Sequence, residues 1–144
     1  MSFARFFSFI DCFDIVGDSV KVTFLSIDDQ KNKVYFESEA SKKDGEFIFL
    51  DKTSIDTTIE LSILTDEVKF VRTGKINSVM KFKENKITKG YYQNDMGLEF
   101  DFDIHCSKLS IEEKRIVIFY TLILDEYMKT NHKISLLFNE TLAK

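Results

Sequence analysis

One charged side chain falls within an apolar alternation, and this makes it the best candidate for a binding group. Val68, Phe70 and Arg72 are spaced two residues apart, so a strand would point all three to one face of its sheet. A guanidinium among core residues needs hydrogen-bond acceptors, because a buried charge without a partner is costly. Backbone carbonyls of the N-terminal segment would give Arg72 a structural role, and a bound anion would give it a functional one.

Tyr92 and Tyr120 are the residues that we group with Arg72 in the functional interpretation. An anionic or carboxylate ligand anchored by Arg72 would have both tyrosines as neighbours. In the alternative interpretation, they are structural aromatic residues whose hydroxyls reach water. The predicted ligand-binding set is therefore Arg72, Tyr92 and Tyr120.

A row of acidic residues ending in a histidine could suggest a metal site, but the spacing argues against one. Glu99, Asp101, Asp103 and His105 share one face of the strand predicted around them. Same-face neighbours on a strand lie about 6.6 Å apart, too far for several to reach one ion held at about 2 Å. We expect a solvated acidic face, with no metal ion and no other cofactor.

Groups suited to catalysis are few. His105 and His132 are the only histidines, and neither lies in a nucleophile motif. The chain has no G-x-S-x-G, no H-E-x-x-H and no glycine-rich phosphate loop. We therefore predict no catalytic residue and a protein that is not an enzyme.

A local positive patch surrounds the turn expected at Asn85. Its members are Lys81, Lys83, Lys86 and Lys89. Such a patch could contact RNA or an acidic partner, but lysines on a hairpin also protect strands from edge-to-edge pairing. The formal net charge of -4 and the pI near 5.2 oppose a dedicated nucleic-acid binder, which would present a basic face to phosphates.

Short strands are the elements that must position these side chains. From residue 19 onward, apolar residues recur at every second position in segments separated by turn residues. These segments are 20–24, 34–36, 47–49, 59–63, 68–70, 80–82, 87–93, 97–108 and 133–138. In the clearest of them, Leu98, Phe100, Phe102, Ile104 and Cys106 fall on one face. This pattern predicts a meandering antiparallel sheet.

Residues 116–124 are nearly all apolar and allow two interpretations. Ser110 and Glu113 match a helix capping box ahead of the apolar run. The run itself is rich in β-branched and aromatic residues, which favour strands. We predict a strand here, with a helix as the alternative.

The N-terminal segment has a different period. Phe3, Phe6, Phe7 and Ile10 follow helical spacing and predict a short amphipathic helix. We expect this apolar stripe to pack over one end of the core, because its polar face offers one arginine and a membrane-surface helix needs more basic residues. Acidic residues follow without a small-residue cleavage site, which argues against a signal peptide.

Length and composition indicate one domain over residues 1–144, with a helical or closing segment at 1–17 and a barrel at 19–139. Hydrophobic residues make up 44% and charged residues 31%, and the 15 Phe residues with no Pro suit a sheet.

Cys12 and Cys106 lack metal-site spacing, so we expect a reduced pair, with a disulfide as the alternative. No run of about 18 uncharged apolar residues occurs, and we expect a cytoplasmic protein without a membrane partner.

Three motifs together resemble a known family. They are VRTGKINSVMKF from Val71 to Phe82, the pair Tyr91 and Tyr92 with NDMGLEFDF shortly after it, and RIVIFYTLIL. The set resembles the bacterial YwiB-like family of uncharacterised proteins. Family members tend to have Thr-Pro-Tyr-Gly where this chain has residues 94–97, so it departs from the family at that turn. The family is similar to calycins, which include lipocalins and streptavidin, and this implies a closed barrel with a possible interior cavity.

The resulting fold prediction is mainly β: an antiparallel up-and-down calycin-like β-barrel of about 8–10 strands with a short N-terminal helix. The predicted function is non-enzymatic binding of a small, partly apolar ligand inside the barrel, near Arg72. The alternative is a protein-interaction module whose barrel is solidly packed. The expected partners are thus a small molecule or another protein, and not a nucleic acid or a membrane.

Overall fold

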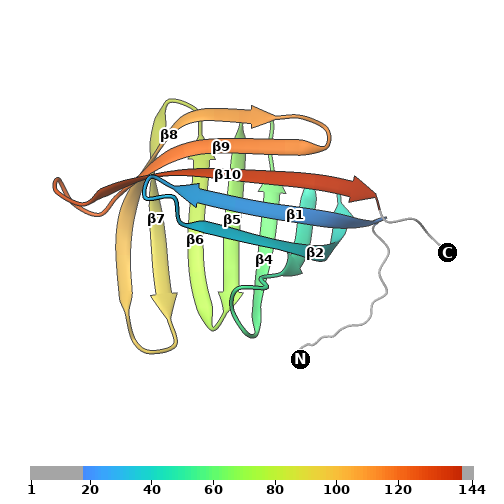
Figure 1. The fold of residues 1–144 in the computed structure, drawn as a ribbon, viewed down its shortest axis with the longest axis horizontal. Coiled ribbons are helices and arrows are strands. Elements are labelled where there is room, and N and C mark those ends of the chain that lie inside the picture. Colours follow the sequence, from blue (N-terminus) through green and yellow to red (C-terminus); the bar gives the residue numbers. More distant parts are fainter. Residues whose placement is uncertain (1–17, 141–144) are drawn as a thin grey trace.

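The computed structural model describes residues 18–140, which form ten β-strands. The strands are β1 (Asp18–Asp28), β2 (Lys33–Lys43), β3 (Glu46–Leu50), β4 (Thr57–Ile63), β5 (Glu67–Gly74), β6 (Ile76–Lys83), β7 (Lys86–Asn94), β8 (Glu99–Ile111), β9 (Arg115–Ile123) and β10 (Lys129–Glu140). Successive strands pair antiparallel, and β1 also pairs with β10, which closes the barrel (Figure 1). The predicted closed antiparallel barrel is confirmed. The predicted N-terminal helix falls at residues 1–17, outside the described residues.

The ambiguous segment at residues 116–124 is a strand, as predicted. Ile116, Ile118 and Tyr120 of β9 are buried, and the residues between them are more exposed. This alternation suits β-branched and aromatic side chains on a pleated surface. Ser110 lies near the end of β8 and Glu113 lies in the β8–β9 turn, so they do not cap a helix.

The starts of β8 and β10 differ from the prediction. Leu98 lies before β8 and is 54% exposed, so it does not share the buried face of Phe100 and Phe102 as predicted. Gly97, which has a φ of 92°, belongs to the turn that precedes β8, and Leu98 directly follows it. β10 begins at Lys129, ahead of the predicted start at Lys133.

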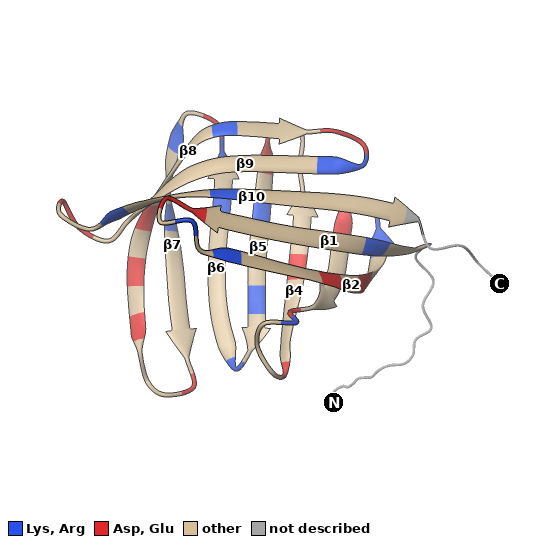
Figure 2. Ribbon diagram, in the orientation of Figure 1, with Lys and Arg blue, Asp and Glu red and all other residues tan. Residues whose placement is uncertain are grey.

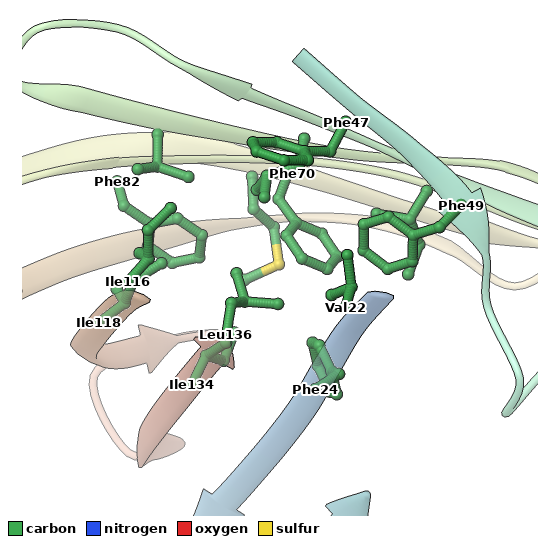
Figure 3. Packing of buried hydrophobic residues seen from close by; sticks show 14 of the residues in the cluster. Val22, Phe24, Phe47, Phe49, Phe70, Phe82, Ile116, Ile118, Ile134 and Leu136 are labelled. Atoms are coloured by element: carbon green, nitrogen blue, oxygen red, sulfur yellow. The ribbon is translucent and has the colours of Figure 1, made fainter. Parts of the chain in front are cut away.

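Side chains from all parts of the barrel fill its middle. Figure 3 shows Val22, Phe70, Phe82, Ile116 and Leu136 pointing into one shared core. Aromatic rings meet closely there, with ring centroids 4.9 Å apart for Phe24 and Phe36. Close packing of this kind leaves the ends of the barrel as the places where a small molecule could enter.

Cys106 belongs to this core as a buried free thiol, and burial raises its pKa to about 11. Cys12 lies outside the described residues. Among residues 18–140, no helix is long and apolar enough to cross a membrane.

Candidate functional site

Arg72 is paired with a carboxylate that the sequence analysis did not identify. Its Nε donates to Oδ2 of Asp51 at 2.8 Å, and the guanidinium carbon lies 5.2 Å from the centre of the Phe70 ring. The Asp51 side chain is 1% exposed, and that of Arg72 is 23% exposed. The pair therefore supplies the acceptor that we had expected from N-terminal carbonyls or from a bound anion.

The loop between β3 and β4 fixes the Asp51 carboxylate. Oδ1 accepts hydrogen bonds from the backbone N–H of Thr53 at 2.9 Å and from its hydroxyl at 2.5 Å. The backbone N–H of Asp51 donates to the carbonyl of Thr57 at 2.9 Å, which ties the two ends of the loop together. Burial acts to raise the pKa of Asp51, but the Thr53 hydrogen bonds and the charge of Arg72 outweigh it and hold the pKa below its usual value.

Ser78 lies beside Arg72 on the next strand and carries an unsatisfied hydroxyl. The register pairs Arg72 of β5 with Ser78 of β6, and Ser78 with Tyr92 of β7. Ser78 is 3% exposed, and its Oγ has no hydrogen-bond partner among residues 18–140. Ser78 therefore places a buried polar atom between two of the predicted ligand-binding residues.

Both predicted tyrosines pack against other aromatic rings. Tyr92 stacks on Phe100 with ring centroids 5.2 Å apart. Tyr120 stacks on His132 at 5.0 Å and tilts against Phe82 at 4.8 Å. The Tyr92–Phe100 pair gives the strands beside Ser78 an apolar surface, whereas Tyr120 is 7% exposed and packs within the core.

Tyr120 lies close enough to Arg72 for the guanidinium charge to affect its pKa. Burial raises its pKa to about 12, and the positive charge of Arg72 partly offsets this rise. The structure thus brings Arg72 and Tyr92 together around Ser78 and keeps Tyr120 within the electrostatic range of Arg72.

Comparison with known proteins identifies the family. The family model described as "Domain of unknown function (DUF1934)" matches residues 20–136. The chain belongs to the DUF1934 family. A solved structure, the ywiB protein from Bacillus subtilis, is similar at a TM-score of 0.58 and 15% identity, covering 86% of this chain and 93% of that chain. No curated protein matches the chain.

The predicted likeness to YwiB-like proteins is therefore confirmed. At 15% identity, the ywiB structure shows that the two chains share a fold. The site of this DUF1934 barrel contains two residues that the sequence analysis missed. Asp51 follows the buried Phe47 and Phe49 at the same two-residue spacing. Ser78 likewise precedes the buried Met80 and Phe82 at that spacing. The same alternation that drew attention to Arg72 could have identified both as inward-facing polar residues.

The acidic residues follow one another along β8 (Figure 2), and they are more exposed than Phe102, Ile104 and Cys106, with which they alternate. Glu99 accepts a hydrogen bond from the Tyr91 hydroxyl at 2.8 Å, and Asp103 forms an ion pair with Lys89 at 2.8 Å. Within the part of the chain that the structure describes, no three acidic, histidine or cysteine side chains are grouped as metal ligands would be.

Neighbouring carboxylates partly neutralise the lysine patch near Asn85. Lys83 lies 3.8 Å from Asp66, and Lys89 pairs with Asp103. Asn85 itself has a φ of 60°, which fits the predicted turn. These pairs favour the structural interpretation of the patch.

Proposed function

We propose that this calycin-like barrel is a cytoplasmic binding protein that holds a small, partly apolar ligand at its Arg72 end and performs no catalysis. The observation that supports the proposal best is the buried hydroxyl of Ser78, which lacks a partner among the described residues. Leaving a buried hydroxyl without a hydrogen bond costs about 1–3 kcal/mol. A ligand that hydrogen-bonds Ser78 would recover this free energy.

The ion pair of Arg72 and Asp51 favours an uncharged ligand over the anion that we first considered. Asp51 already compensates the positive charge of Arg72 from a buried position. The negative charge of an anion bound beside this pair would be buried without a positive charge left to compensate it. The Arg72–Asp51 bond uses Nε, so the terminal amino groups of Arg72 are the donors we assign to a neutral acceptor such as an amide or ketone oxygen.

The body of the ligand would pack on the Tyr92 and Phe100 rings. Tyr92 and Phe100 form one stacked pair beside Ser78, and the Tyr120 ring stacks on His132. Flat or aliphatic groups suit such surfaces. Because the middle of the barrel is filled, the site suits a compact ligand at one end.

The filled core also supports the alternative proposal, a protein-interaction module. In that case, Arg72 and Asp51 only close the β3–β4 loop against the barrel, and the outer surface does the binding. Ser78 would then be a local packing defect without a functional role.

A thermal-shift experiment separates the two proposals. Benzamide and hexanamide are compared with benzoate and hexanoate, matched probes that differ in charge, and native mass spectrometry of gently purified protein looks for a retained ligand. The binding proposal predicts that the amides raise Tm more than the acids. A ligand at one hundred times its Kd stabilises a protein by about 2.7 kcal/mol.

Two variants show whether the response belongs to this site. Ser78→Ala should abolish the Tm shift, while Ser135→Ala, a matched change on the outer face of β10, should retain it. If no probe shifts the wild type, no ligand is retained, and Ser78→Ala is simply more stable, the barrel end binds nothing and the interaction module is the better account.

A further inference from the structure

The closed barrel has a strand segment that is paired on one side only. β8 pairs with β7 along residues 99–106, but its pairing with β9 begins at the contact of Asp103 with Ile123. Within residues 18–140, the ladder therefore leaves residues 99–102 of β8 with a free edge. Every second residue along such an edge presents its N–H and C=O outward. Four residues offer about 13 Å of unpaired strand.

A groove runs beside this free edge. The β9–β10 connection bends away from β8, as Figure 1 shows, and a groove of about 450 Å³ lies between them. Its apolar part comes from Phe102, Ile123 and Leu124. Leu124 is 39% exposed, although it is a large aliphatic residue. The groove can thus accommodate side chains as well as backbone.

The charge around the groove is mainly negative. Four carboxylates line it, those of Asp101, Asp103, Asp125 and Glu126. The two cations are Lys89 and Lys129, and Lys89 is already paired with Asp103. Figure 2 shows the acidic residues along this part of β8 and at the tip of the β9–β10 connection. A positively charged occupant would complement this lining.

We propose that this groove binds an extended, basic segment of a partner protein, which adds to the free edge of β8 as an extra strand. Backbone hydrogen bonds to residues 99–102 would supply affinity, and alternate side chains would supply specificity. Alternation places one set of side chains toward the carboxylates and the other toward Phe102 and Leu124. The segment that fits best alternates lysine or arginine with aliphatic residues.

A second copy of this chain is a poorer occupant. Pairing two β8 edges would bring two acidic rows together, and like charges across a strand pair are destabilising. The formal net charge of -4 adds to this repulsion.

The test uses fluorescence anisotropy with a labelled hexapeptide that alternates lysine and valine, and a control that alternates glutamate and valine. The wild type should bind the lysine peptide at least about tenfold more tightly. Asp101→Lys should weaken this binding about tenfold, while Glu60→Lys, an exposed matched change on β4, should alter it less than about twofold.

Two N-methylated peptides test strand addition separately from charge. Methylation of alternate amides blocks a strand edge on one side of the peptide and leaves its charge intact. One of the two alternate patterns should abolish binding to wild-type protein, and the other should retain it. Equal binding of both patterns, equal binding of the lysine and glutamate peptides, or a dimer of the protein that Asp101→Lys dissociates would each overturn the proposal.

Discussion

Gly90 of β7 lies directly beneath the ring of Phe102 on β8. A Cβ atom placed on Gly90 would lie 2.3 Å from Cε2 of Phe102 and 2.6 Å from its Cζ. The register pairs these two residues, and the Phe102 ring is buried against Phe100 at a centroid distance of 6.0 Å. The absence of a side chain at Gly90 thus lets the Phe102 ring pack directly against the backbone of β7.

Gly90→Ala should therefore destabilise the barrel by overpacking, by about 1–3 kcal/mol. Phe102→Leu should remove the clash, so the double variant should be more stable than the sum of the single effects predicts, by about 1 kcal/mol or more. Urea denaturation of the four proteins measures this coupling. If the changes in the free energy of unfolding were strictly additive, the Phe102 ring would move aside from the added methyl group without an energetic cost.

Removal of either partner of the Arg72–Asp51 pair should be costly. Asp51→Ala leaves a half-buried guanidinium without its acceptor, and Arg72→Met leaves a carboxylate that is 1% exposed without its cation. Each change should cost about 3 kcal/mol, at the low end of the range for buried pairs because Arg72 retains some contact with water.

The double variant, Asp51→Ala with Arg72→Met, should cost less than the sum of the two by about 1–3 kcal/mol. Equilibrium urea unfolding gives all three values. Additivity within about 0.5 kcal/mol would contradict a direct energetic link between the two side chains.

Acid should weaken this same pair. The pKa of the Asp51 carboxyl is lower in the folded state than its usual value, so the unfolded chain binds protons more readily. The stability that the carboxylate contributes is complete above the unfolded pKa and is lost as the pH falls through the folded pKa. The stability advantage of wild type over Asp51→Asn should therefore shrink from pH 6 to pH 3. A constant difference would show that the ionised carboxylate does not matter.

The strands could be predicted because their side-chain period does not depend on which strand lies beside them. Phe47 and Phe49, for example, face inward as their alternation with exposed residues implies. The pairing of Asp51 with Arg72 required more, since it depends on the register of β3, β4 and β5 and on the path of a loop. Register is a property of the closed barrel, so the acceptor could not be named from spacing alone.

A bulge limited the prediction in a second place. The register of β8 against β9 shifts between Cys106 and Lys108, so Leu109 and Ile111 pack against the core after the change of phase. One inserted residue reverses the inward and outward positions that follow it. The alternation of apolar and polar residues up to Cys106 does not indicate that a bulge follows.

The function of the polar end was the least accessible part. Arg72 and Tyr92 could be selected as candidates, yet only the register places Ser78 between them. A serine in phase with Met80 and Phe82 is common in sheets, and its hydroxyl becomes informative only when its neighbours offer no partner.

His132 should make the stability of the barrel depend on pH near neutrality. Burial lowers the pKa of His132 below its usual value, and the negative charges of Asp28 and Asp29 partly offset this. The unfolded chain therefore takes up a proton at a higher pH than the folded one. Stability should be constant well above pH 6.5 and should fall as the pH drops below it, until the folded pKa is reached.

His132→Phe tests this prediction because a phenyl ring can keep the stacking on Tyr120, which is now 5.0 Å between centroids, while it removes the titrating group. The bond between Nε2 of His132 and the Thr130 hydroxyl, 2.7 Å long, is lost at every pH and so shifts the curve without changing its slope. Urea midpoints at pH 7.5 and 5.5 should differ more for the wild type than for His132→Phe. His105→Gln, an outward-facing change on β8, serves as the matched control and should keep the wild-type difference. Parallel curves for wild type and His132→Phe would mean that proton uptake at this end of the barrel is not linked to folding.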